Sequence, residues 1–282
     1  MSLVSLQSIL TAADRGGYAV GAFNAFNVET TQAVVAAAEA EKSPVILLVY
    51  DGHQRHFGIA ESAAIGRALA EAASVPVALH LDHGASFEMV VKCLQAGYTG
   101  VMFDGSRLPY EDNVAITKRV TEVAHLCGVS VEAELGQVGV AARGDGAKAD
   151  LMTAPDQAAD FVAQTQVDAL AVAIGNAHGF YTDTPKLDFE RLAAINEAVS
   201  VPLVLHGGTG IPDDDLRRAI ELGIRKVNIG TEVMTAFGTT LREALKNTEG
   251  PIVGLAELAQ AKRAMQEKIQ ARMRVLGSSG KA

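Results

Sequence analysis

The chain has 282 residues, of which 49% are hydrophobic, and a formal net charge of -9. A chain of this length and composition can bury one large core, so residues 1–282 are expected to form a single domain. Because the charge is acidic and no long run of Lys or Arg occurs, binding to nucleic acid or acidic membranes by bulk electrostatics is excluded, and an anionic ligand needs a local site.

The N-terminal segment, MSLVSLQSIL, has no basic residues ahead of its apolar ones, and no stretch is apolar over the roughly 18 residues needed to span a bilayer. Secretion and membrane insertion are therefore not expected. The two cysteines, Cys93 and Cys127, do not form a CxxC pair, so neither a disulfide framework nor a thiolate zinc site is expected. A cytoplasmic location is the default expectation.

Short apolar runs rich in β-branched residues alternate with longer segments of helical periodicity, the pattern of βα units around a parallel sheet. The expected strands are Tyr18–Phe23, Val45–Val49, Val77–Leu81, Gly100–Phe103, Val129–Leu135, Ala169–Ile174, Leu203–Leu205 and Ile224–Ile229. The expected helices between them are Thr30–Glu41, Glu61–Ala73, Phe87–Gln95, Asn113–His125, Asp156–Gln164, Phe189–Val199 and Asp213–Leu222. Eight alternations favour a closed (β/α)8 TIM barrel. A doubly wound open sheet is the alternative, but no GxGxxG follows the first strand.

Two stretches do not fit this repeat. Gly136–Met152 is rich in glycine and alternating charges, which predicts a long mobile loop after the fifth strand. Leu255–Leu276 is strongly helical and lies beyond the eighth barrel helix. This additional C-terminal helix is expected either to cap the barrel or to reach a partner subunit.

Polar residues follow nearly every expected strand, and in barrel enzymes the reacting groups lie at the C-terminal ends of strands. These residues are Asn24, Tyr50, Asp51, Asp82, His83, Asp104, Glu132, Glu134, Asn176 to His178, His206 and Asn228. Three of them, His83, His178 and His206, are each followed by glycine. Three imidazoles at one barrel mouth would form a catalytic zinc site with a fourth position open for substrate. The alternative is that each histidine bonds to a loop carbonyl.

The other histidines are interpreted as structural. His80 shares the inward side of its strand with Asp82 and is expected to be a hydrogen-bonded residue of the barrel interior. His53 and His56 lie on a loop or helix start, and His125 ends a helix.

Glu132 and Glu134 lie two residues apart on one strand, so both side chains point into the barrel. Buried carboxylates need a cation or hydrogen bonds, and a metal or positive partner is therefore expected nearby. For Glu132 a Lys or Arg lower in the barrel is the alternative partner.

Glycine-rich turns follow the seventh and eighth strands, at His206–Gly210 and Asn228–Thr231. Such turns expose backbone N–H groups to an anion, and these two loops form the usual phosphate site of barrels. The sequence therefore predicts a phosphate site there, although simple tight turns would have the same composition.

Seven segments together resemble the class II fructose-bisphosphate and tagatose-bisphosphate aldolases over nearly the whole chain. They are VPVALHLDHG (75–84), GYTGVMFDGSRLPYEDN (97–113), VEAELGQVG (131–139), LAVAIGNAHGFY (170–181), VPLVLHGGTGIP (201–212), KVNIGTE (226–232) and the terminal GSSGKA. The resemblance implies reversible aldol cleavage of a phosphorylated ketose to dihydroxyacetone phosphate and an aldehyde.

The resemblance also implies roles for individual residues. Zn²⁺ would be held by His83, His178 and His206, with Asp104 and Glu134 at a second or alternative position for another divalent or a monovalent cation. Asp82 would move the proton of the aldehyde-side oxygen. The residues implied to bind the substrate or its phosphate are Asn24, Gly179, Gly207, Gly208, Thr209, Asn228, Ile229, Gly230 and Thr231. A homodimer or homotetramer is expected.

The chain departs from the family's pattern around the aldehyde half of the substrate. The segment Gly139–Asp145 lacks the loop Glu that exchanges the carbon-bound proton, and Tyr50 stands where many members have Ser or Gly. The family's C-terminal Arg for a distal phosphate matches only loosely to Lys262 or Arg263. We hypothesise that the aldehyde is not glyceraldehyde 3-phosphate and that Asp145, another loop residue or a substrate group supplies the proton.

Two other functions fit parts of the sequence. A class I aldolase needs a Schiff-base lysine, but the strand ends offer none, and Lys226 lies inside the last strand. A non-catalytic sugar-phosphate-binding barrel would keep the metal and phosphate sites without the proton-exchange Glu.

Overall fold

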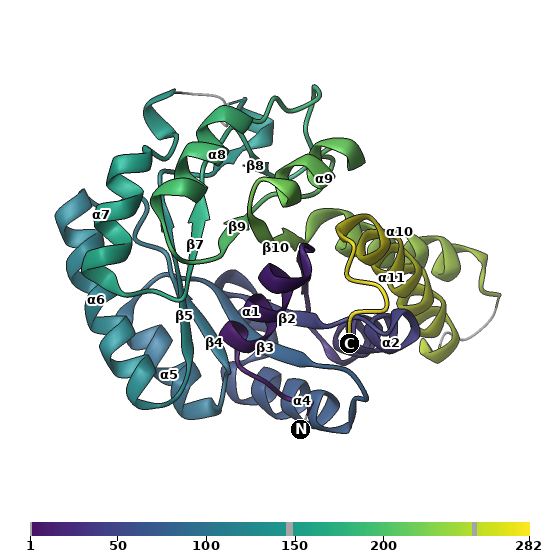
Figure 1. The fold of residues 1–282 in the computed structure, drawn as a ribbon. Coiled ribbons are helices and arrows are strands. Elements are labelled where there is room, and N and C mark those ends of the chain that lie inside the picture. Colours follow the sequence, from purple (N-terminus) through teal and green to yellow (C-terminus); the bar gives the residue numbers. More distant parts are fainter. Residues whose placement is uncertain (1, 145–148, 250–252) are drawn as a thin grey trace.

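Eight parallel strands close into a barrel in the computed structural model, which describes residues 2–144, 149–249 and 253–282 (Figure 1). The barrel strands are β1 (Val20–Asn24), β2 (Val45–Tyr50), β3 (Val77–Gly84), β4 (Gly100–Phe103), β5 (Ser130–Leu135), β7 (Ala169–Val172), β9 (Leu203–Leu205) and β10 (Ile224–Ile229). Their order around the ring is β1-β10-β9-β7-β5-β4-β3-β2. The predicted (β/α)8 barrel is confirmed, with small shifts at the strand ends.

Helices surround the barrel. They are α1 (Leu6–Gly16), α2 (Val28–Glu41), α3 (Gln54–Phe57), α4 (Ile59–Ala72), α5 (Phe87–Ala96), α6 (Tyr110–Leu126), α7 (Pro155–Thr165), α8 (Phe189–Ala198), α9 (Asp213–Glu221), α10 (Thr231–Asn247) and α11 (Leu255–Leu276). Every helix that the periodicity predicted is present. The helix α1 and the four-residue α3 were not predicted, and α10 was expected only as an eighth barrel helix without bounds.

Alternation along the strands separates the buried side chains into two clusters. Outward residues such as Leu47 and Leu79 join the cluster between the sheet and the helices. Inward residues such as Ala22 and Ala171 form a second cluster that includes Leu6 and other residues of α1. Because α1 packs on this interior cluster, it closes one end of the barrel and leaves the other end, where the strands finish, for a site.

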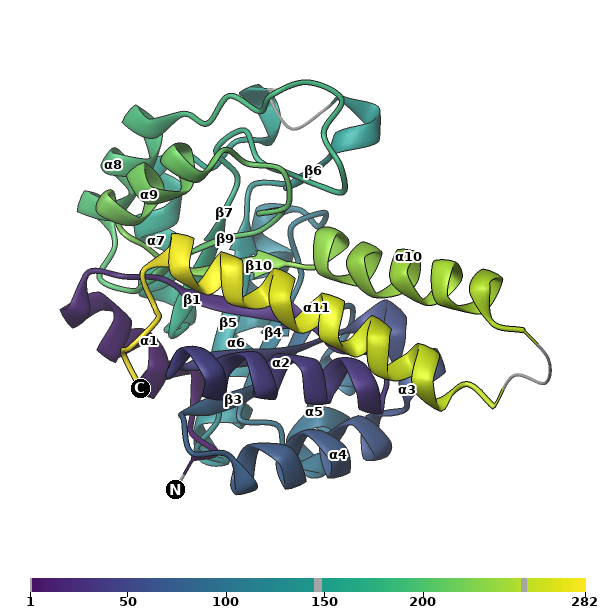
Figure 2. The same ribbon diagram turned by 90° about the vertical axis from the view of Figure 1, so that its right-hand side faces the viewer.

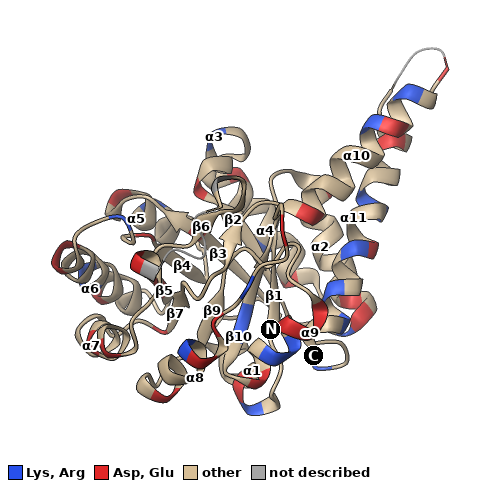
Figure 3. Ribbon diagram, turned by 90° about the horizontal axis from the view of Figure 1, so that it is seen from above, with Lys and Arg blue, Asp and Glu red and all other residues tan. Residues whose placement is uncertain are grey.

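The helices α10 and α11 form an antiparallel pair that extends beyond the barrel (Figure 2). The predicted C-terminal helix has the predicted bounds and packs against both α10 and α2. Figure 3 shows charges of both signs distributed over the outer helices and along this pair. Among the described residues, no helix combines the length and apolar character of a membrane span.

The segment predicted as a long loop, 136–152, contains regular structure in its described part. A short strand, β6 (Gly139–Val140), pairs in parallel with β8 (Ala177–His178) above the barrel. Two turns of 3₁₀ helix follow, η2 (Ala141–Arg143) and η3 (Ala149–Leu151). Pairing with β8 supplies backbone partners that an irregular loop over the barrel mouth would lack. Asp145 lies outside the described residues.

Candidate metal and substrate site

A cavity of about 960 Å³ occupies the end of the barrel where the strands finish. The predicted site residues that line it are Asn24, Asp82, His83, Asp104, Glu134, His178, Gly179, Gly207, Thr209, Asn228, Gly230 and Thr231. Asp82, Glu134 and Asn228 reach it because each lies on the inward side of its strand, as the alternation predicts. Twelve of the 26 described residues that line this cavity were thus predicted as site residues.

Three predicted residues do not line the cavity. His206 is fully buried but contacts His83 beneath the surface. The amide of Gly208 donates to the carbonyl oxygen of Asn228 at 3.0 Å, so it is not free for a phosphate. Ile229 belongs to the core between barrel and helices. Gly208 and Ile229 thus stabilise the phosphate turns and do not line the cavity.

His83 faces the cavity because of an irregularity in β3. Alternation alone would point His83 away from the barrel, since its neighbour Asp82 points inward. The register between β3 and β4 shifts between Leu81 and Gly84, and His83 adopts a left-handed conformation with φ 51°. A bulge of this kind redirects a side chain, and its strained backbone is typical of functional positions.

His178 reaches the site on β8, six residues beyond the end of β7, rather than directly at a strand end. Two side chains hold its segment to the turn that carries His206. The Asn176 amide donates to the carbonyl oxygen of His206 at 3.0 Å. The Tyr181 hydroxyl accepts from the Ala177 amide at 2.7 Å and donates to the Gly207 carbonyl at 3.3 Å.

The same two segments approach so closely that Gly207 must be glycine. It has φ 65°, and a Cβ there would lie 2.1 Å from the Ala177 carbonyl oxygen. Any other residue would push the two segments apart. The glycine after His206 therefore allows the segments that carry His178 and His206 to lie close together.

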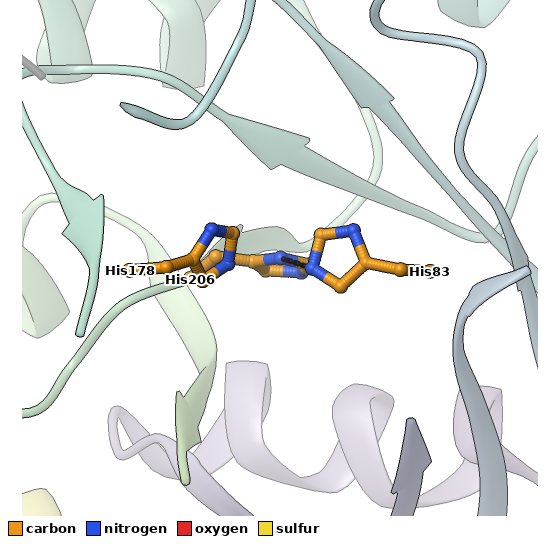
Figure 4. A group of neighbouring side chains, drawn as sticks. All are labelled: His83, His178 and His206. Atoms are coloured by element: carbon orange, nitrogen blue, oxygen red, sulfur yellow. Dashed lines mark hydrogen bonds between the residues drawn. The ribbon is translucent and has the colours of Figure 1, made fainter. Parts of the chain in front are cut away.

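The three histidine rings converge from separate segments of the chain (Figure 4). One ring nitrogen from each of His83, His178 and His206 lies within 4.8 Å of the others. His83 Nε2 and His206 Nδ1 are 3.0 Å apart. Such spacing suits three ligands of one metal ion with an open fourth position.

The remaining nitrogens of two rings contact carboxylates. His83 Nδ1 lies 2.7 Å from Asp104 Oδ2, and His206 Nε2 lies 2.9 Å from Glu132 Oε1. Carboxylates behind ligating histidines fix the tautomer and the ring orientation. Asp104 is thus placed to orient His83, in addition to its predicted role at an alternative cation position.

Glu134 supplies a further cation-binding feature. Its Oε1 accepts from the Val138 amide at 3.1 Å, while its Oε2 is buried and has no hydrogen-bond partner within the described part of the chain. Oxygen and nitrogen atoms of Glu134, Asp104 and His83 also lie within 4.8 Å of one another. Burial and the nearby Asp104 raise the pKa of Glu134. An unpartnered carboxylate oxygen beside imidazoles fits a metal ion.

The pKa values of two histidines reflect the negative charge of the carboxylates around the site. Burial opposes protonation of His83, but Asp82 and Asp104 outweigh it and raise its pKa to about 10. Burial and the neighbouring His83 and His206 lower the pKa of His178 to about 3. The carboxylates thus favour a cation at this position, and His178 is neutral, as a metal ligand must be.

A buried polar network underlies the histidines. Lys226 Nζ lies 2.8 Å from Glu132 Oε2 and donates to Asn228 Oδ1 at 2.7 Å. Asn228 in turn donates to Asp82 Oδ1 at 3.0 Å. For Glu132 the structure thus supports the alternative of a lysine partner. His80 Nε2 lies 3.4 Å from Glu132 Oε2, but neither ring nitrogen of His80 has a hydrogen-bond partner among the described residues, contrary to the expectation.

Of the two predicted phosphate turns, Asn228–Thr231 leads directly into α10. Gly230 is the N-cap of this helix, and Gly230 and Thr231 line the cavity. The N-terminal amides of a 17-residue helix favour an anion. The hydroxyl of Thr209 accepts from the Glu232 amide at 3.2 Å, which ties the two turns together.

Two structural partners of this site were not predicted. Tyr181 was quoted only as part of a motif, and its hydroxyl bridge depends on a chain reversal that periodicity does not reveal. Arg107, which lines the cavity, was likewise only part of a motif. Its position in the loop after the fourth strand was the available signal.

Comparisons with known proteins point to one family. The family model described as "Fructose-bisphosphate aldolase class-II" matches residues 4–281. A fructose-bisphosphate aldolase of Geobacillus stearothermophilus is 45% identical over 100% of this chain and 99% of that protein. The D-tagatose-1,6-bisphosphate aldolase subunit GatY of Klebsiella oxytoca is 43% identical over 99% of each. The crystal structure of the YdjI aldolase from Escherichia coli K12 matches with a TM-score of 0.89 and 37% identity over 99% of each chain.

Proposed function

The chain belongs to the class II fructose-bisphosphate aldolase family and is an aldehyde-lyase. From this premise we propose that it cleaves a ketose phosphate to dihydroxyacetone phosphate and an aldehyde with the residues described above. The observation that carries the proposal is the convergence of three histidine nitrogens within 4.8 Å at the mouth of the barrel. Membership of class II argues against a Schiff-base mechanism, and Lys226, fully buried against Glu132, does not line the cavity.

We infer that His83, His178 and His206 hold Zn²⁺. An all-imidazole set suits zinc, and the unpartnered Glu134 Oε2 and nearby Asp104 provide the alternative position for a cation. When bound, the metal supplies Lewis-acid polarisation of the ketone oxygen and stabilises negative charge on the ketose-derived half. The carboxylates of Asp104 and Glu132 orient His83 and His206 for this task.

Asp82 is the proposed base of the cleavage direction. Burial would raise its pKa, but the imidazoles of His83 and His206 and the Lys226 ammonium lower it, so the group is a carboxylate. The Asn228 amide holds its Oδ1, which leaves Oδ2 to take the proton from the substrate hydroxyl next to the breaking carbon–carbon bond. In the reverse direction the same carboxyl returns that proton.

The turns at Gly207, Thr209, Gly230 and Thr231, with Gly179, are the proposed site for the phosphate of dihydroxyacetone phosphate. They combine cavity-lining glycines with the N-terminus of α10. Asn24 and Asn228 line the adjacent wall and offer amides to the substrate hydroxyls.

The proposal also includes the group that protonates the substrate carbon atom left by carbon–carbon cleavage. Residues 139–144 carry no carboxylate, and Asp145 lies outside the described residues. We infer that Asp145, another residue of this loop, or a group of the substrate itself delivers the proton. Turnover of D145A equal to that of the parent enzyme would remove Asp145 from this set.

We also infer a cytoplasmic enzyme that forms a homodimer or homotetramer. The pair of helices α10 and α11 extends beyond the barrel, and Val253 and Leu255 near its tip are 82% and 74% exposed. Exposed apolar side chains on a projecting segment suit contact with another copy of the chain. Sedimentation equilibrium tests this inference.

The proposed reaction is tested by condensing dihydroxyacetone phosphate with a panel of neutral, acidic and phosphorylated aldehydes in the presence of zinc. We expect turnover that EDTA abolishes and that added Zn²⁺ restores. Binding of dihydroxyacetone phosphate without turnover of any aldehyde, and without exchange of its α-proton, would instead support a non-catalytic sugar-phosphate-binding barrel. Turnover that survives EDTA would contradict the metal assignment.

A further inference from the structure

The side of the cavity opposite the phosphate turns carries one unpaired cation. Among the described residues that line the cavity, Arg107 is the only Lys or Arg. It follows β4 and is exposed, and it forms no ion pair or hydrogen bond with the described residues. The other charged lining residues, Asp51, Asp82, Asp104 and Glu134, are all acidic. An unpaired guanidinium in an otherwise acidic cavity is a candidate anion site.

The barrel topology fixes where this cation lies relative to the proposed phosphate site. In the closed ring β4 lies directly opposite β10, and β3 lies opposite β9. The phosphate turns follow β9 and β10, while Arg107 follows β4. His83 lies near the end of β3, the neighbour of β4, and meets His178 and His206 from β8 and the turn after β9. A substrate whose phosphate lies on the turns and whose ketone lies at the histidines therefore extends toward Arg107.

Local contacts hold the loop of Arg107 against this part of the site. The Asp104 Oδ1 atom accepts from the amide and hydroxyl of Ser106 at 3.1 and 2.7 Å, and the Leu108 amide donates to the Gly105 carbonyl at 2.9 Å. Because Asp104 Oδ2 contacts His83, both oxygens of Asp104 are engaged by other groups. The loop of Arg107 is thus tied to a proposed metal ligand.

An aromatic side chain borders the same side. Tyr50 ends β2 with its ring 6.0 Å from His83 and 5.2 Å from His53. Tyr50 and Arg107 both line the cavity. A phenol on this wall adds a hydrogen-bond donor for a polar group of the substrate.

We propose that Arg107 binds an anionic group at the far end of the aldehyde half, and so makes the enzyme prefer ketose 1-phosphates that end in a carboxylate or phosphate over those that end in a neutral group. This inference rests on the proposed function, because it places the first phosphate and the ketone as described above. It makes Arg107 a specificity-determining residue, since a carboxylate or phosphate matches the guanidinium fork and a neutral hydroxymethyl group does not.

The test compares three ketose 1-phosphates of equal length that end in a hydroxymethyl group, a carboxylate or a phosphate. Cleavage by the zinc-loaded enzyme is measured by the release of dihydroxyacetone phosphate. We expect kcat/KM for one or both anionic compounds to exceed that for the neutral compound by about 10-fold or more. The compound with the highest value tells whether carboxylate or phosphate is the natural group.

Variants then assign the preference to its residue. We expect R107A to lower kcat/KM for the preferred anionic compound about 10- to 100-fold and to leave the neutral compound within about 3-fold. R107K should retain part of the preference and R107E should reverse it. The matched control is R217A, which removes an arginine paired with Asp214 on the outer helix α9. Metal content and circular dichroism of each variant verify that the fold and the metal site persist.

Equal cleavage of all three compounds by the parent enzyme would overturn the inference, and so would an equal loss for all three in R107A. If R263A lost the preference for anionic compounds while R107A kept it, the anion site would lie at α11, and the inference would also be overturned. Absence of cleavage of every compound would overturn the proposed function instead. In that case the role of Arg107 is tested by calorimetric binding of the three compounds. Tighter binding of the anionic compounds that R107A removes would support the role of Arg107, and equal binding of all three would refute it.

Discussion

Lys226 Nζ lies 2.8 Å from Glu132 Oε2 beneath the three histidines, and both side chains are fully buried. Glu132 Oε1 contacts His206, and Lys226 also donates to Asn228, which holds Asp82. One ion pair thus supports both the proposed metal site and the proposed base. Removing one partner of a buried pair leaves an uncompensated charge in a low-dielectric interior.

We therefore expect K226M to destabilise the enzyme by about 3–5 kcal/mol, measured by urea unfolding of the metal-loaded protein. The double variant K226M/E132Q should be less destabilised than the two single changes together, because it removes both charges. The control is K92M, whose lysine belongs to an exposed pair with Glu88, and its unfolding midpoint should equal that of the parent. Strictly additive effects of the two changes would contradict the coupling.

The Tyr181 hydroxyl joins the segments that carry two of the proposed metal ligands, His178 and His206. We expect Y181F to keep the packing of the ring but to weaken zinc affinity about 10-fold or more, as is typical for lost outer contacts of a metal site. Competition with a chelator of known affinity measures the change. Y110F is the matched control, because the Tyr110 hydroxyl contacts the exposed Asp160 and neither residue lines the cavity. Unchanged zinc affinity in Y181F would show that Asn176 alone holds the two segments.

Strand periodicity predicted the barrel and much of the site because inward residues near strand ends must face one cavity. Asp82, Glu134 and Asn228 are examples, since each lies where alternation places it. His83 is different. Its approach to the cavity depends on the register shift in β3 and on a left-handed backbone, neither of which follows from the pattern of apolar residues.

Long-range contacts account for what the sequence did not predict. The pairing of β6 with β8 joins Gly139 to Ala177, residues separated by the whole of α7 and β7, and no local propensity encodes it. Lys226 was located on the last strand, but its hydrogen bond to Asn228 depends on side-chain geometry inside the barrel. Gly208 was predicted to bind phosphate from the glycine-rich turn after the seventh strand and from the family resemblance, but its amide donates to the Asn228 carbonyl within the fold.

Asp82 is held by Asn228 and lies 3.9 Å from His83 Nε2, at the centre of the proposed chemistry. We expect D82A and D82N to lower kcat about 10²- to 10⁴-fold, the range for loss of a general acid or base. Both variants should still bind one equivalent of zinc, because Asp82 is not among the proposed ligands. Steady-state cleavage kinetics and metal analysis of the same preparations check both points. Loss of zinc in D82N would assign Asp82 to the metal site instead.

Glu41 joins the end of α2 to the C-terminal segment, and its pH dependence follows from its contacts. Arg274 donates from Nη2 to Oε1 at 2.5 Å and from Nε to Oε2 at 3.2 Å, and Ser279 donates to Oε2 at 2.8 Å. Burial would raise the pKa of Glu41, but these hydrogen bonds outweigh it and lower the pKa below its ordinary value of 4.5. Because the folded pKa is the lower one, the stabilisation is complete above about pH 5 and disappears as the pH falls through the folded pKa.

We therefore expect E41Q to be less stable than the parent by about 1 kcal/mol at pH 7, which lowers Tm by about 2–4 °C. The difference should narrow as the pH is reduced below 4.5, because the parent then protonates the same carboxylate. Calorimetric scans of both proteins from pH 7 to pH 3 measure it. E71Q, which alters an exposed pair with Arg67, is the control and should follow the parent at every pH. A constant difference between E41Q and the parent across this range would mean that Glu41 acts through packing and not through its charge.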